Sequence, residues 1–149
     1  QRRLVNEHAR VQSPLGRIRH LPDVRSEEQG VRAEAERQAI NSPVQSLASD
    51  MNIFAMSLIH AQFAEQGIRG YVLGTVHDAI NFEVHEKDVG KALPLIKHTM
   101  ENLPLRRFFG LDLDVPMVAD LKVGHHWGGA HEVPEHLVES WDPKWLKGK

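Results

Sequence analysis

The chain of 149 residues contains no cysteine, which excludes disulfide bridges, thiolate zinc sites and cysteine nucleophiles. It also lacks any apolar run approaching the roughly 20 residues that a membrane-spanning helix needs. Its N-terminus has no apolar core of the kind found in signal peptides. We therefore expect a protein without membrane association that resides in the cytoplasm.

A strong excess of basic charge is missing as well. The 18 Lys and Arg residues are outnumbered by 20 Asp and Glu residues, which gives a formal net charge of −2. Free-standing nucleic-acid-binding domains usually carry a clear basic excess, so this balance disfavours autonomous DNA binding. What the chain does have is 41% hydrophobic residues and the length of about one domain, which is enough for a sizeable core.

The order of apolar patterns and helix breakers predicts alternating helices and strands. Residues 1–12 are expected to form the end of a helix, and residues 17–21 a short strand. A helix over residues 26–40, with Ser26 as its N-cap, should follow. Pro43 has no N–H to donate to the preceding turn, so the helix is expected to kink or restart just before it.

Beyond Pro43, apolar residues recur at three- and four-residue intervals and predict a long helix that ends near Gly67. They are Val44, Leu47, Ala48, Met51, Phe54, Ala55, Leu58, Ile59 and Phe63. A β-hairpin over residues 70–85, a helix over 88–103 and a strand over 115–123 are expected next. Together these elements predict an α+β fold, in which long helices back an antiparallel sheet that includes the hairpin.

The predicted hairpin has a polar tip, His77-Asp78, between two apolar strand-like runs. His and Asp tolerate the positive φ that tight hairpin turns often demand, so the pair could serve only to make the turn. Alternatively, the tip could hold a carboxylate at a fixed, exposed point. The hairpin alone leaves both interpretations open.

A second motif, Glu36-Arg-Gln-Ala-Ile-Asn-Ser-Pro-Val-Gln45, lies about thirty residues before the tip. In this order the two motifs resemble the C-terminal part of the polymerase domain of family A DNA polymerases, which carries E-R-x-A-I-N-x-P-x-Q-G and then V-H-D-E. The segments Gly16-Arg-Ile-Arg-His-Leu-Pro22 and Val123-Gly-His-His-Trp127 are similar to two further motifs of the family.

The resemblance spans residues 14–131 and implies a partial polymerase domain of the palm type. Residues 1–131 would be the C-terminal palm and fingers part of a family A polymerase domain, and residues 132–149 a C-terminal tail. The family includes bacterial and many phage enzymes, so the expected location is the cytoplasm of a bacterial or phage-infected host cell.

Arg37, Asn41 and Gln45 recur at four-residue intervals, which places them along one ridge of a continuous helix. All three can donate hydrogen bonds to the acceptors that every base pair offers in the minor groove. The resemblance implies that they contact template-primer DNA. The alternative is that Arg37 pairs with Glu34 or Glu36 while Asn41 caps the restarted helix.

The resemblance also implies that Asp78 and His77 are the catalytic residues. Asp78 would be a ligand of Mg²⁺ in a two-metal site for nucleotidyl transfer from a dNTP, a reaction in which two ions stabilise the attacking and leaving oxygens. His77 would lie beside the primer terminus and contact the DNA rather than the metal.

Two departures from the family pattern limit what the chain can do alone. Ala79 stands where the family usually has a glutamate, and the D-Y-S-x-x-E-x-R strand and the fingers helix do not occur in the chain. We therefore expect residues outside this chain to complete the two-metal site. They would come from the remainder of the polymerase, as an N-terminal part or a separate subunit, and the isolated chain would be inactive.

Two other functions fit the same residues. One is a stand-alone metal-dependent phosphohydrolase built around His77-Asp78 and a set of histidines, either His125 and His126 with His131 or the same pair with His85 and His98. The other is a non-catalytic relic of the fold that binds DNA or protein, which Ala79 and the missing motifs would permit.

Overall fold

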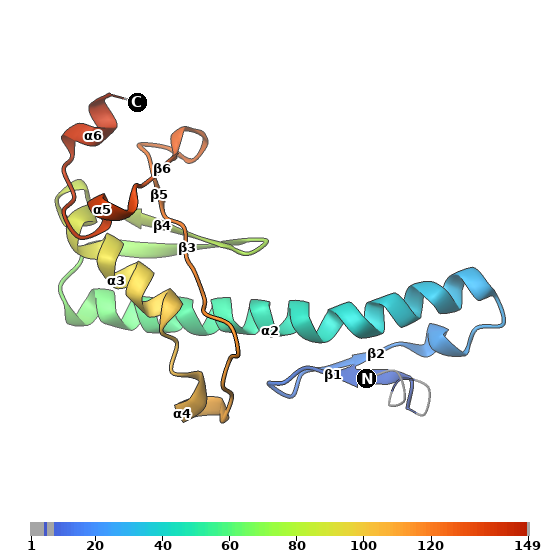
Figure 1. The fold of residues 1–149 in the computed structure, drawn as a ribbon. Helices are drawn as coiled ribbons and strands as arrows, with labels where there is room; N and C mark the ends of the chain where they lie inside the picture. The colour runs from blue at the N-terminus through green and yellow to red at the C-terminus, as the bar shows by residue number, and fades with distance from the viewer. Residues whose placement is uncertain (1–4, 6–7, 149) are drawn as a thin grey trace. The chain divides into compact units, whose positions relative to one another are not determined.

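The structure, a computed structural model, describes residue 5 and residues 8–148. The start of the helix predicted over residues 1–12 falls largely outside these described residues. The chain divides into two compact units (Figure 1). Unit 1 comprises Gln1–Met51 and Arg106–Leu111, and unit 2 comprises Asn52–Leu105 and Asp112–Lys149.

Unit 1 contains a short antiparallel hairpin, β1 (Arg10–Gln12) and β2 (Ile18–His20), with Val11 opposite Arg19. The predicted strand over residues 17–21 is confirmed by β2. A helix reaching residue 12 is wrong, because the backbone of β1 pairs with β2 instead. The hairpin and a 3-10 helix, η1 (Pro22–Arg25), cover a small core on the following helix. That core comprises Val5, Val11, Leu21, Val24, Ala35 and Ala39.

The helix that follows, α2 (Gln29–Glu65), runs without interruption through Pro43, so the predicted restart is wrong. It begins at Gln29, whereas Ser26 lies outside it and accepts a hydrogen bond from the Glu28 N–H at 3.2 Å. Beside the proline, the Ser42 hydroxyl donates to the Gln38 carbonyl at 2.6 Å and accepts from Arg19 Nη1 at 3.0 Å. Arg19 of β2 is thereby linked to the turn of α2 that contains Pro43.

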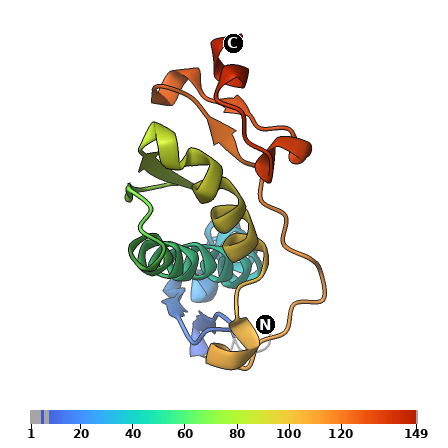
Figure 2. The same ribbon diagram turned by 90° about the vertical axis from the view of Figure 1, so that its left-hand side faces the viewer.

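Unit 2 is built on the predicted hairpin, which is present as β3 (Gly70–Val76) and β4 (Ala79–Val84). It packs with the C-terminal half of α2 and with α3 (Val89–Glu101), as Figures 1 and 2 show. The core comprises Ala55, Ile59, Phe63, Ile68, Ala92, Leu95 and Ile96, against which Ile80, Phe82 and Val84 of β4 pack. A Cβ on Gly70 would lie 2.7 Å from the Phe63 ring, so this close approach requires glycine.

The base of the hairpin is fixed by a buried carboxylate. Asp88 is 7% exposed, and its Oδ2 accepts hydrogen bonds from the Arg69 backbone N–H at 3.1 Å and from Arg69 Nε at 2.7 Å. Asp88 ends a 3-10 turn, η2 (Glu86–Asp88), directly before α3. The start of β3 is thereby tied to the start of α3. The side-chain bond from Arg69, followed by the backbone bond, lowers the pKa of Asp88 to about 2.

The strand predicted over residues 115–123 is wrong except at its end, where β5 (Lys122–Val123) pairs with β6 (His131–Glu132). Side chains of α3 take the place of a neighbouring strand at Ala119. Lys97 Nζ donates to its carbonyl at 2.9 Å, and Glu101 Oε1 accepts from its N–H at 3.0 Å. Both backbone groups of Ala119 are therefore bonded without a neighbouring strand.

The C-terminal segment packs on the same unit through a core cluster of Leu93, Val133 and Val138. It contains a 3-10 turn, η3 (Trp127–Gly129), and two short helices, α5 (Glu135–Val138) and α6 (Lys144–Lys147). One further short helix, α4 (Leu105–Phe109), follows α3. Among the described residues, no helix has the length and hydropathy required to cross a membrane.

Replacing Ile59 by alanine should destabilise unit 2 by about 2–5 kcal/mol, because the side chain is fully buried and leaves a cavity. Urea denaturation of the chain measures this change. Ile53 is 55% exposed on the same helix, so Ile53→Ala is the matched control and should change stability by about 0.5 kcal/mol or less. Equal losses from both substitutions would contradict the core assignment.

Stability should also depend on the ionisation of Asp88. Its pKa is lowered in the folded protein, so its stabilising contribution is present above its ordinary value of 3.8 and is lost as pH falls from there towards about 2. Asp88→Asn should therefore lower the urea midpoint at pH 7, and the gap from the parent protein should narrow below pH about 4. Asp120→Asn, at an exposed position, is the control and should leave both measurements unchanged.

Candidate functional site

His77 and Asp78 are the two residues that connect β3 to β4, between the paired residues Val76 and Ala79. His77 has a φ of 56°, in the left-handed region that histidine enters more readily than most residues. The pair therefore makes the turn, as the simpler interpretation predicts. Both side chains are exposed, so making the turn leaves them available for a further role.

The backbone of Asp78 is hydrogen-bonded, whereas its side chain is exposed. Its backbone carbonyl accepts a hydrogen bond from Nδ2 of Asn52, on α2, at 2.9 Å. Its carboxylate makes no hydrogen bond or ion pair with any residue that the structure describes. The tip is thus anchored through the backbone while the carboxylate faces solvent.

Asn52 is a site residue that the sequence analysis missed. It lies within the apolar stretch of α2, beside the buried Met51. In the sequence, the only indication of its role is a polar amide among apolar residues. Its partner is a backbone carbonyl 26 positions away. No pattern of residue types reports such a bond, because every residue carries a carbonyl.

A β-bulge lies between the core and the tip. The register passes from Val72 opposite Phe82 to Gly74 opposite Asn81, which leaves Leu73 as an extra residue in β3. Gly74 has a φ of 152°, a conformation that other residues rarely adopt. Bulges bend and twist a strand and are common next to functional sites, so this one sets the direction of the tip.

The tip fits one part of a magnesium site. Mg²⁺ is usually held by one or two carboxylates together with phosphate oxygens and water, and an exposed carboxylate at a fixed point suits it. Within the described ranges no group of three or more His, Cys, Asp or Glu residues could hold a metal ion. The residues present therefore fit a single protein ligand, Asp78, rather than a complete site.

The predicted ridge of α2 lies within unit 1, where Arg37, Asn41 and Gln45 are all exposed. Asn41 is inside the continuous helix, so its predicted alternative as the cap of a restarted helix is wrong. Neither Asn41 nor Gln45 forms a side-chain hydrogen bond with another described residue. Their amide groups are therefore available to an outside acceptor.

Arg37 is paired with Glu34, as the alternative interpretation predicts. Its Nε donates to Glu34 Oε2 at 3.0 Å, and its Nη2 contacts the same oxygen. The hydrogen bond from Arg37 is the main reason that the pKa of Glu34 lies below its usual value. Both side chains are largely exposed, so the pair does not shield Arg37 from a ligand.

The part of α2 that follows Arg37 carries little free negative charge. Residues 38–49 contain no Asp or Glu. The next carboxylate, Asp50, is bound by Arg17, whose Nε lies 3.2 Å from Oδ1. A polyanion that approaches the ridge from this side meets neutral donors rather than unpaired carboxylates.

Comparison with known proteins identifies the family. Residues 1–129 match the family described as DNA polymerase family A. The DNA polymerase of Bacillus phage SP01 is 34% identical over 141 residues, which cover 91% of this chain and 15% of the relative. DNA polymerase I of Rhizobium leguminosarum is 36% identical over 130 residues, which cover 86% of this chain and 12% of the relative.

A solved structure agrees with the sequence match. The POL domain of Pol1 from M. smegmatis, in complex with DNA primer-template and dNTP, aligns with a TM-score of 0.65 and 33% identity. The alignment covers 76% of this chain and 19% of that chain, so the chain spans only a small part of the proteins it matches. The predicted family and the α+β fold are confirmed, and this chain belongs to the family A DNA polymerases.

Proposed function

We propose that this chain is the C-terminal portion of a DNA-directed DNA polymerase, which supplies the metal-binding hairpin and a helix face that contacts the minor groove of template-primer DNA. The observation that carries the proposal is the tip of the hairpin, where Asp78 is held by its backbone and its carboxylate is exposed. Family membership supplies the chemical context for that carboxylate.

Asp78 acts as the protein ligand of magnesium at this tip. In nucleotidyl transfer, bound Mg²⁺ stabilises charge on the attacking 3′-hydroxyl and on the leaving pyrophosphate of a dNTP. Asn52 fixes the backbone from which the carboxylate projects. Imidazole is a poor ligand for Mg²⁺, so His77, beside Asp78 in the turn, does not bind the metal. It donates a hydrogen bond to the DNA at the primer terminus.

The remainder of the polymerase completes the site. Ala79 provides no second carboxylate on the hairpin, so further metal ligands and the residues that bind the dNTP come from an N-terminal part or a separate subunit. In this arrangement residues 1–131 are the palm and fingers part, residues 132–149 are a tail, and the isolated chain is inactive. The assembled enzyme acts on DNA in the cytoplasm of a bacterial or phage-infected cell.

The ridge of α2 senses the shape of the newly made duplex. Arg37, Asn41 and Gln45 present donors at spacings of one helical turn. Purine N3 and pyrimidine O2 occupy nearly equivalent places in every correct base pair, so donors in the minor groove accept any sequence. A copying enzyme requires this kind of contact, because it must bind a primer end without preferring one base.

A non-catalytic DNA-binding relic of the same fold is the second candidate. The observation in its favour is that Asp78 is the single carboxylate at the tip, with Ala79 beside it. The two functions differ in what they require of Asp78. A binding relic retains its DNA affinity and has no activity to lose when this carboxylate is removed.

Asp78→Ala should reduce primer extension by the complete polymerase about a thousand-fold or more. Loss of several kcal/mol of transition-state charge stabilisation has this consequence, since each 1.4 kcal/mol is a factor of ten. Rapid-quench primer extension with saturating dNTP measures the effect. Asp114→Ala, which removes an exposed carboxylate elsewhere, is the control and should retain full activity. Unchanged extension by Asp78→Ala would contradict the catalytic assignment.

Asn41→Ala and Gln45→Ala should each weaken template-primer binding by the complete polymerase about 2- to 10-fold, the value of one hydrogen bond. Both side chains are neutral, so the dependence of affinity on salt should not change. Fluorescence anisotropy with A·T and G·C primer ends should show the same loss for both. Gln29→Ala, at the exposed start of α2, is the control. A loss confined to one base pair would indicate sequence readout instead.

A further inference from the structure

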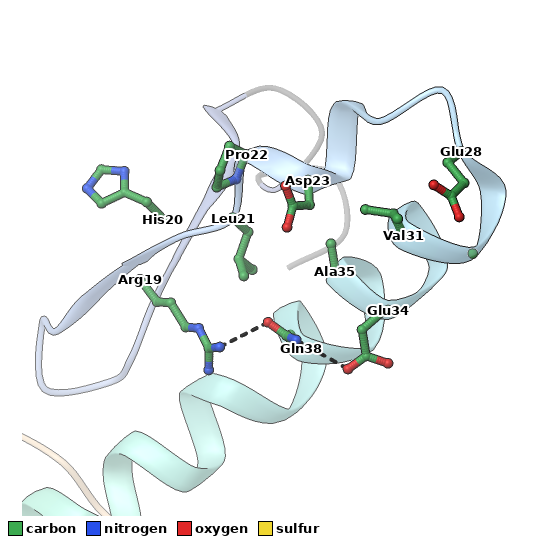
Figure 3. Close-up of a pocket in the computed structure, with 11 residues that line it drawn as sticks. Arg19, His20, Leu21, Pro22, Asp23, Glu28, Val31, Glu34, Ala35 and Gln38 are labelled. Carbon is green, nitrogen blue, oxygen red and sulfur yellow. Dashed lines mark hydrogen bonds between the residues drawn. The ribbon is translucent and has the colours of Figure 1, made fainter.

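A chain of hydrogen bonds in unit 1 leads from β2 to Arg37. Arg19 Nη2 donates to Gln38 Oε1 at 2.9 Å, and Gln38 Nε2 donates to Glu34 Oε1 at 3.2 Å (Figure 3). The other oxygen of Glu34, Oε2, accepts from Arg37 Nε at 3.0 Å. Arg19, Gln38 and Glu34 also line an open pocket of about 430 Å³.

Arg19 and Glu34, on either side of Gln38, fix the orientation of its amide group. An arginine can only donate and an ionised carboxylate can only accept, so the Gln38 amide satisfies both neighbours in one orientation alone. Glu34 likewise uses one oxygen for Gln38 and the other for Arg37. Gln38 and Glu34 are thus each held by two partners.

The chain of bonds starts from a buried group rather than from solvent. Arg19 Nη1 donates at 3.0 Å to the hydroxyl of Ser42, which is 3% exposed and itself donates to the Gln38 carbonyl at 2.6 Å. This anchorage distinguishes the arrangement from an isolated surface ion pair, which is usually mobile and weak.

Glu34 occupies only one edge of the Arg37 guanidinium. Nε and Nη2 are engaged, whereas Nη1 makes no hydrogen bond with the described residues. A guanidinium carries five N–H donors in a rigid fork, so holding one edge fixes the direction of the remaining donors. Arg37 is 71% exposed in its side chain, which leaves these donors accessible to DNA.

We propose that Glu34, Gln38 and Arg19 are positioning residues that hold Arg37 in the orientation in which its free donors meet the minor groove at the primer end. The inference rests on the proposed function, in which Arg37 contacts template-primer DNA. A donor held in place bonds well to acceptors in correct positions and poorly to the displaced acceptors of a mismatch. A mobile donor follows the acceptors and discriminates less.

Gln38→Met tests the inference because it removes both amide bonds with little change in volume or charge. In the complete polymerase, kcat/KM for extending a matched primer end should fall about 3- to 10-fold, the value of an oriented hydrogen bond. The ratio of matched to mismatched extension should fall by a similar factor. Gln29→Met makes the same substitution at an exposed position of α2 and should change neither quantity.

Glu34→Ala and Glu34→Gln separate position from charge. Removing a carboxylate near DNA should tighten binding of matched and mismatched ends alike if only charge matters. Under the positioning role, Glu34→Ala lowers the matched-to-mismatched ratio. Glu34→Gln keeps an acceptor for Arg37 but turns its NH2 group towards the Gln38 donor, so it should restore only part of the ratio. Thermal unfolding of each variant checks that unit 1 remains folded. Equal ratios for both variants and the parent enzyme would overturn the inference.

A double-mutant cycle with Arg37→Ala completes the test. If Gln38 acts through Arg37, Gln38→Met should have no further effect in the Arg37→Ala background. The inference is wrong if Arg37→Ala impairs discrimination while Gln38→Met behaves like Gln29→Met, or if the effect of Gln38→Met persists without Arg37. If Arg37→Ala itself leaves binding and discrimination unchanged, the proposed DNA contact of Arg37 fails, and the inference fails with it. Loss of activity in Asp78→Ala is independent of either result.

Discussion

An antiparallel pair of strands is only marginally stable alone, so the β3–β4 hairpin depends on how unit 2 holds it. Ile80, Phe82 and Val84 bury one face on the core of α2 and α3. Asp88 fixes its base through Arg69, and Asn52 fixes its tip through the Asp78 carbonyl. With both ends held, the position of the Asp78 backbone, from which the carboxylate projects, is set by the packing of unit 2 rather than by the turn alone.

In both units, some polar groups are engaged in bonds within the protein while neighbouring polar groups are exposed to solvent. In unit 2 the backbone of Asp78 is bonded while its carboxylate is left to solvent. In unit 1 the carboxylates of Glu34 and Asp50 are engaged by arginines, whereas the amides of Asn41 and Gln45 face solvent. Groups that would repel a polyanion are partly neutralised, and groups that can bond to one remain accessible. Both arrangements suit contact with DNA and phosphates.

The sequence predicted those features that depend on neighbours within a few turns or across one tight turn. Within the predicted apolar stripe, Met51, Ala55, Ile59 and Phe63 are buried, as expected. Val44 and Ala48, at the start of the stripe, are exposed, so this part of the prediction is wrong. The hairpin was predicted from two apolar runs on either side of a polar tip. Strand β1 was missed although Gln12 lies opposite Ile18, only six positions away, because residues 1–12 were expected to end a helix. The uninterrupted course of α2 was missed because the lack of an N–H on Pro43 was expected to break the helix. For the candidate site, motifs gave the tip residues and the ridge, whereas Asn52 and the bonds from Arg19 to Gln38 could not be found from residue spacing.

The presence of one carboxylate at the tip, with Ala79 where the family motif has a glutamate, has a physical consequence for how the site is used. Two carboxylates close together repel each other unless a cation or a proton lies between them, and one of their pKa values rises. A single exposed aspartate avoids this repulsion, so the tip can form without a bound ion. Such a tip has low intrinsic affinity for magnesium, which prefers several hard oxygen ligands. Under the proposed function, tight binding would require phosphate oxygens and further protein ligands, so the ion would be retained only when the substrate and the remainder of the polymerase are in place.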